Sequence, residues 1–107
     1  MAVSFEGANP RHEHEWAVFE DVELPDGKVV MPGVVDSTTN YIEHPELVAQ
    51  RLERYARLVG RERVMASSDC GFATFAAMLT VDPGITWAKL SAMAEGAAIA
   101  SGRLWRR

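Results

Sequence analysis

Three short apolar runs, separated by loops and helices, constrain the fold of this chain more than any other feature. The longest run, residues 29–35, is almost continuously apolar, as is typical of a parallel strand buried on both faces. Shorter runs at residues 2–5 and 64–68 are also strand candidates. A short helix is predicted over 16–22 and a longer one over 45–59, so strands alternate with helices. This alternation predicts an α/β fold with a parallel sheet.

Two helices have clear signatures. The segment 45–59 begins with Pro45 at the first helical position, carries Glu46 at the positive end of the helix and stops before Gly60. A second, long helix is predicted to start at Asp82-Pro83, and its many Ala and Gly residues would permit close approach to a neighbour. Residues three or four positions apart mark one face of each helix: Val48, Leu52, Tyr55 and Val59 in the first, and Trp87, Leu90, Ala94, Ala97 and Ser101 in the second.

The predicted sheet is too small to be complete. Three parallel strands leave two open edges, and a chain of 107 residues has few segments to cover both faces of a parallel sheet. We therefore interpret the chain as part of a larger sheet, whose exposed strand edges would favour association.

Composition narrows the class of protein. The chain is 48% hydrophobic and 24% charged, which is ordinary for a globular domain. Its net charge of -4 argues against nucleic-acid binding, which usually needs a basic face. No apolar run reaches the roughly 20 residues of a membrane span, and no signal peptide is recognisable. We expect a cytoplasmic protein that binds neither nucleic acid nor membrane.

Acidic and thiol groups follow the three predicted strands. Glu6 follows the first, Asp36 the second, and Asp69 with Cys70 the third. In parallel α/β folds, functional groups gather at the C-terminal ends of strands. A carboxylate in such a place can instead cap a turn or the next helix, and that interpretation stays open for Asp36 and Asp69. The single cysteine cannot form an internal disulfide, so it is a metal ligand, a reactive thiol or an inert buried residue.

Three motifs occur in order along the chain: Val-Ser-Phe-Glu at 3–6, Met-Pro-Gly-Val-Val-Asp at 31–36 and Ser-Asp-Cys-Gly at 68–71. They resemble the last three strand ends of cobalamin-independent methionine synthases. Two further stretches, Asn-Pro-Arg-His-Glu-His-Glu at 9–15 and Asp-Ser-Thr-Thr-Asn at 36–40, resemble the methionine synthase II-like branch, which also holds the coenzyme M alkyltransferases. The resemblance covers nearly the whole chain.

The resemblance implies both a fold and a chemistry. That family folds as a (β/α)8 TIM barrel, so residues 1–107 would be its C-terminal segment, with about three βα units. Glu6 and Cys70 match two of the family's zinc ligands, and Asp36 and Asp69 would shape the catalytic pocket. A thiol bound to zinc is deprotonated, and the family uses this to move a methyl or alkyl group onto homocysteine or a related thiol. The implied partners are Zn²⁺, a thiol acceptor and a methyl or alkyl donor.

Two departures from the family pattern matter. The sequence lacks the His-x-Cys pair that supplies the other zinc ligands, and catalytic zinc typically has three or more protein ligands. Thr38 stands where methionine synthases have a His thought to protonate the folate leaving group, which puts a methyltetrahydrofolate donor in doubt. The alternative to an enzyme part is a catalytically silent fragment, which acts only by self-association or by binding a chain with the missing strands.

The histidines complete the set of candidate residues. His12 and His14 could chelate a metal in an extended segment, because alternate residues share a face. Their charged neighbours make a solvated or salt-bridged loop equally natural, and contacts that order the loop or bind substrate are favoured over ligation. His44 precedes Pro45 and is interpreted as a residue of the helix cap.

Overall fold

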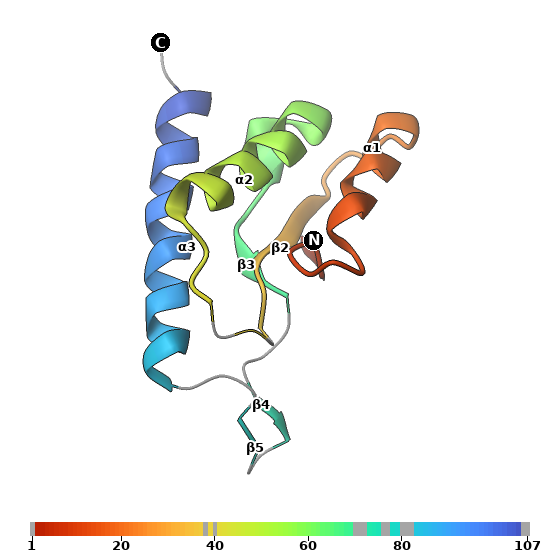
Figure 1. The fold of residues 1–107 in the computed structure, drawn as a ribbon. Helices are drawn as coiled ribbons and strands as arrows, with labels where there is room; N and C mark the ends of the chain where they lie inside the picture. The colour runs from red at the N-terminus through yellow and green to blue at the C-terminus, as the bar shows by residue number, and fades with distance from the viewer. Residues whose placement is uncertain are drawn as a thin grey trace.

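The computed structural model describes residues 2–37, 39, 41–69, 73–75, 78–79 and 83–105. Its centre is a parallel sheet in the order β1–β2–β3, formed by Ala2–Phe5, Val29–Val35 and Ser67–Ser68 (Figure 1). A separate antiparallel pair consists of β4 (Ala73–Phe75) and β5 (Met78–Leu79). The predicted α/β class with parallel strands is confirmed, whereas the sequence analysis did not predict the β4–β5 pair.

Helices follow each strand of the parallel sheet. After β1, a 3-10 helix, η1 (Glu13–Ala17), leads directly into the short helix α1 (Val18–Asp21). After β2 comes α2 (Pro45–Val59) and then a 3-10 turn, η2 (Arg61–Arg63). The long helix α3 (Pro83–Leu104) follows the β4–β5 pair. The structure confirms the predicted bounds of α2, while the helix predicted over 16–22 begins earlier, at Glu13.

Local signals explain why α2 begins and ends where it does. The side chain of His44 accepts a hydrogen bond from Glu46 N at 3.0 Å, which confirms its predicted place in the cap. At the other end, Gly60 has a φ of +107°, a conformation that favours glycine, and its N–H donates to Ala56 O. The predicted stripe is buried as well: Val48, Leu52, Tyr55 and Val59 are all less than one tenth exposed.

The strand register brings the C-terminal ends of the three strands to one edge of the sheet. β1 pairs in parallel with β2 from Ala2↔Val29 to Phe5↔Pro32. β2 continues beyond β1 and pairs with β3 at Gly33↔Ser67 and Val35↔Ser68. The third strand is shorter than predicted, because Val64 forms only an isolated bridge with Val30 and the ladder resumes at Ser67.

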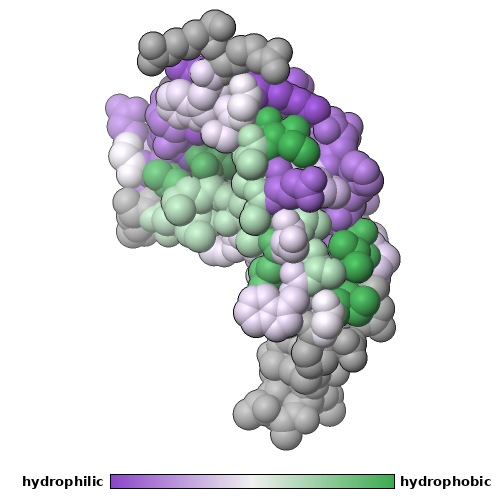
Figure 2. Space-filling model, turned by 90° about the vertical axis from the view of Figure 1, so that its left-hand side faces the viewer, coloured by the Kyte–Doolittle hydropathy of each residue, from purple (hydrophilic) through white to green (hydrophobic). Residues whose placement is uncertain are grey.

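The face of α3 that packs inward consists of small residues and one lysine. Lys89, Ala92, Gly96 and Ala100 are buried, at spacings of three or four. Gly96 permits the predicted close approach, because an added Cβ would lie 2.5 Å from the Val48 side chain on α2. The predicted face of Trp87, Leu90, Ala94, Ala97 and Ser101 is not the most buried one: Trp87 is 72% exposed, and Ala94 and Ser101 are exposed as well. The side of the molecule formed by α3 accordingly shows hydrophobic as well as hydrophilic surface (Figure 2).

The hydrophobic core lies between β2 and the helices α2 and α3. Its buried members are Val34, Val35, Val48, Ala49, Leu52 and Ala100. A second cluster, which is aromatic, consists of Phe5 of β1, Phe19 and Tyr55. The centroids of these three rings lie 5.8–6.1 Å apart. Among the described residues, β1 is hydrogen-bonded to β2 on one side only, and Val3 is 42% exposed. No helix in the described ranges is long and apolar enough to cross a membrane.

Candidate functional site

The predicted site residues that the structure describes lie at the C-terminal edge of the sheet. Glu6 follows β1, Asp36 follows β2 and Asp69 follows β3. The parallel register places these three ends next to one another. Cys70 and Thr38 lie outside the described residues. The sequence-based prediction for the position of Cys70 therefore stays a prediction.

Asp69 joins the end of β3 to the loop that follows β1. Its Oδ1 accepts hydrogen bonds from Gly7 N at 2.8 Å and Ala8 N at 2.9 Å, and its Oδ2 accepts one from Asn9 Nδ2 at 2.8 Å. The side chain is buried against β2, where a Cβ on Gly33 would lie 2.0 Å from Oδ1. A glycine at position 33 is therefore required for this contact. The structure gives Asp69 the role of an anchor for residues 7–9.

A buried cation supports the same loop from the helix side. Arg51 of α2 donates from Nη1 to Val34 O at 3.1 Å and from Nη2 to Ala8 O at 3.4 Å. The same Nη2 lies 3.5 Å from Glu13 Oε2. These bonds tie the end of β2 to the loop after β1. The burial of Arg51 was not predicted from the sequence. It is explained by the carbonyl groups of Val34 and Ala8, which need hydrogen-bond donors at the strand ends.

Asp36 is held by a network of Glu43, in the loop before α2, and Lys89 of α3. Its backbone N–H donates to Glu43 Oε2 at 2.6 Å, and Glu43 Oε1 lies 2.9 Å from Lys89 Nζ. Both side chains of this ion pair are fully buried, and Lys89 Nζ also donates to Thr39 Oγ1 at 3.3 Å. This pair was not predicted from the sequence. One signal was present, because Lys89 is a lone lysine on the small-residue face of α3.

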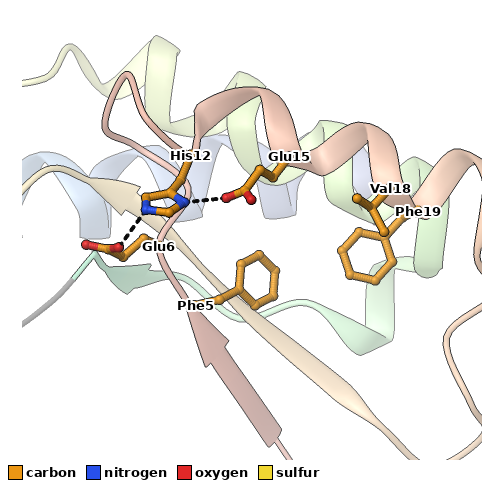
Figure 3. A pocket seen from close by; sticks show the side chains of 6 residues that line it. All are labelled: Phe5, Glu6, His12, Glu15, Val18 and Phe19. Carbon is orange, nitrogen blue, oxygen red and sulfur yellow. Dashed lines mark hydrogen bonds and ion pairs between the residues drawn. The ribbon is translucent and has the colours of Figure 1, made fainter.

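Glu6 interacts with a histidine from the loop that follows it. Its Oε2 lies 3.1 Å from His12 Nε2, and His12 Nδ1 lies 2.5 Å from Glu15 Oε1 (Figure 3). The side chains of Glu6 and His12 are about one third exposed. The interpretation of the His-x-His segment as a salt-bridged loop therefore agrees with the contacts of His12. His14, which lies in η1, is exposed.

Two cavities flank the Glu6–His12 pair. One, of about 390 Å³, lies at the sheet edge, and its lining includes Glu6, Asn9, Arg11, His12, Asp36 and Thr39. The other, of about 410 Å³, is more apolar and is lined by Phe5, Glu6, His12, Glu15, Val18 and Phe19 (Figure 3). The first cavity combines two carboxylates with cationic and hydroxyl groups. It is the candidate site, because it contains the residues that follow both β1 and β2.

A three-ligand metal cluster is not formed within the described residues alone. No group of three or more His, Cys, Asp or Glu side chains there has an arrangement suited to a metal ion. The predicted pair of Glu6 and Cys70 includes a residue outside that set. The prediction that this chain binds zinc therefore stays a prediction.

Comparison with known proteins defines the class to which this site belongs. Residues 2–98 match the family model of the cobalamin-independent synthase catalytic domain, and the chain belongs to this family. The fold is similar to that of a B12-independent methionine synthase from Shewanella sp. W3-18-1, solved in complex with selenomethionine, with a TM-score of 0.79 and 27% sequence identity. The match covers 99% of this chain and 28% of that one. None of the curated proteins matches.

These matches confirm the family inferred from the three motifs, and they confirm the fold class, which corresponds to part of a (β/α)8 barrel. The chain spans 28% of the length of the solved relative. The assignment of residues 1–107 to the C-terminal segment of a catalytic barrel stays a prediction.

Proposed function

We propose that this chain is the C-terminal segment of a barrel that transfers a methyl or alkyl group to a thiol of the homocysteine type, with zinc as the metal. Glu6 and Cys70 are the two zinc ligands that the chain supplies. Family membership supports methyl transfer in general. The choice of a thiol acceptor rests on the resemblance of the strand-end motifs.

One contact carries the pairing of Glu6 with Cys70. Asp69, which directly precedes Cys70, binds the backbone N–H of Gly7, which directly follows Glu6, at 2.8 Å. Two residues whose immediate neighbours are hydrogen-bonded to each other are well placed to share one metal ion. A carboxylate and a thiolate are both donors that zinc accepts, so the residues fit the metal. When bound, zinc would lower the proton affinity of the substrate thiol.

The other residues of the cavity are proposed to hold the substrate. Asp36 lines the 390 Å³ cavity together with Glu6, and Arg11 and Thr39 add a cation and a hydroxyl group. This volume suits a small, polar thiol rather than a large cofactor. Asp36 is held in place by Glu43 and Lys89, and Asp69 keeps the loop after β1 closed against β2. In this proposal Asp36 shapes the pocket directly, and Asp69 positions the loop that carries the metal ligand.

Calorimetric titration of zinc into the purified chain tests the proposal. Two protein ligands form an incomplete cage, so weak binding with one zinc per chain is expected. Binding should be lost in Cys70→Ser and strongly reduced in Glu6→Gln. His14→Ala is the matched control, because His14 is exposed and belongs to the same loop. Zinc binding that survives both ligand substitutions would refute the proposal.

The second candidate function is association through the edge of β1 that no other described strand covers. Ala2, Val3 and Ser4 are exposed along this strand, and the apolar side chains of Val18 and Val22 on the neighbouring segment are more than half exposed. The match covers 28% of the solved relative, so most of that protein has no counterpart in the matched chain. We propose that a chain carrying further barrel strands, or a second copy, covers this edge. Light scattering at micromolar concentration tests it, and a monomer with cooperative thermal unfolding would contradict it.

A further inference from the structure

His12 is the side chain through which the loop after β1 acts on Glu6. Its two ring nitrogens each meet a carboxylate oxygen, Glu6 Oε2 at 3.1 Å and Glu15 Oε1 at 2.5 Å (Figure 3). Either ring nitrogen can donate its N–H to the carboxylate oxygen that it faces. Glu15 thereby sets the orientation of the ring, and the ring in turn sets the orientation of the Glu6 carboxylate.

The backbone that carries His12 is itself fixed to the sheet. His12 N donates to Asn9 O at 3.0 Å, and Glu15 N donates to His12 O at 2.9 Å. Asn9 is held by Asp69, whose Oδ2 accepts from Asn9 Nδ2 at 2.8 Å. A continuous series of hydrogen bonds thus runs from Asp69 through Asn9 and His12 to Glu6. The series returns to the strand end from which the loop leaves, so the position of the ring does not depend on an unsupported loop.

We propose that His12 is the positioning residue for Glu6 as a metal ligand, with its ring oriented by Glu15. This inference rests on the proposed function, in which Glu6 binds zinc. By holding Oε2, His12 limits the carboxylate to one orientation before the metal arrives, which reduces the entropy lost on binding. Hydrogen-bond partners of metal ligands typically account for about 10-fold to 100-fold in metal affinity. His12 itself lies outside the coordination sphere in this proposal.

Two substitutions of the same residue separate the two ring contacts. In His12→Gln the side-chain amide can replace the Nε2 donor to Glu6, whereas in His12→Asn it can replace the Nδ1 donor to Glu15. We expect His12→Asn to lower zinc affinity about 10-fold to 100-fold and His12→Gln to retain most of it. Zinc affinity is measured on the full chain by competition with a chromophoric chelator. The control is His14→Ala, and far-UV circular dichroism checks that each variant keeps the helix content of the wild type.

The outcomes distinguish this inference from the proposed function. Equal, wild-type affinity in both His12 variants would overturn the positioning role while leaving Glu6 and Cys70 as ligands. Equal loss in both variants, with one fewer imidazole on zinc by X-ray absorption, would make His12 a ligand and would also overturn the proposal. If Glu6→Gln and Cys70→Ser both bind zinc as tightly as the wild type does, the proposed function itself is refuted. Rescue by Gln but not by Asn, with an unchanged set of ligands, supports the positioning of Glu6 by His12.

Discussion

Removal of the buried cation Lys89 should destabilise the chain more than any surface substitution. Its ammonium group and the Glu43 carboxylate are both fully buried, 2.9 Å apart, and Glu43 also accepts the Asp36 N–H at 2.6 Å. In Lys89→Met the apolar volume is roughly kept, but the carboxylate loses its counter-charge inside the protein. Breaking a buried pair in this way typically costs about 3–5 kcal/mol. That is a large part of the stability of about 5–15 kcal/mol that small domains have.

A double variant separates the charge from the packing. In Glu43→Gln with Lys89→Met, the amide oxygen can still accept the Asp36 N–H, and no charge stays buried. Replacing a whole buried pair is often neutral or stabilising, so the double variant should recover most of the loss. Urea unfolding followed by circular dichroism measures the free energy of unfolding of the single and the double variant. All samples are kept at one protein concentration, because association shifts apparent stability. A cost below about 1 kcal/mol for Lys89→Met, or a double variant as unstable as the single one, would refute the reasoning.

Other predictions concern helix packing and the aromatic group. Gly96→Ala should destabilise the chain by about 1–3 kcal/mol, because the added Cβ would lie 2.5 Å from the Val48 side chain. Gly102→Ala should stabilise it by about 0.4–1 kcal/mol, because a Cβ added there has no neighbour within 4 Å beyond its own helix turn among the described residues. Thermal unfolding of the two variants compares these effects. Tyr55→Phe should not destabilise in urea unfolding at neutral pH, because Tyr55 Oη is buried without a hydrogen-bond partner among the described residues, and a clear loss of stability would contradict this. Burial raises the pKa of Tyr55 to about 12 from its ordinary value of 10.0, so ionisation of this group leaves the free energy of unfolding unchanged below pH 10 and lowers it as pH rises towards 12. The phenylalanine variant should lack that loss when stability is followed over this range.

Local signals in the sequence were enough for the elements that depend on few partners. The position of Pro45, the apolar stripe and Gly60 predicted the bounds of α2, and the continuous apolar run predicted β2. The third strand was overestimated, because its ladder with β2 resumes only at Ser67. The packed face of α3 could not be found from the spacing of Trp87 and Leu90, since close packing against α2 selects small residues such as Gly96.

The site was predictable where it depends on topology and not where it depends on long-range contacts. The predicted strand ends identified Glu6, Asp36 and Asp69 as candidate residues, because parallel strands present their C-terminal ends at one edge of the sheet. Sequence periodicity carries no information about partners more than 40 residues apart. For this reason the pairing of Glu43 with Lys89 and the anchoring of residues 7–9 by Asp69 became visible only in the structure.

The most direct test of the account is whether Glu6 and Cys70 bind the same metal ion. Cobalt(II) can replace zinc, and a cobalt-bound thiolate gives a charge-transfer band in the near ultraviolet. We expect the wild type to develop this band on titration, Cys70→Ser to lack it, and Glu6→Gln to develop it only at higher cobalt concentration. A band with the same cobalt dependence in Glu6→Gln and in the wild type would show that the carboxylate and the thiolate do not share a metal. The absence of any band in the wild type would contradict a metal site at Cys70.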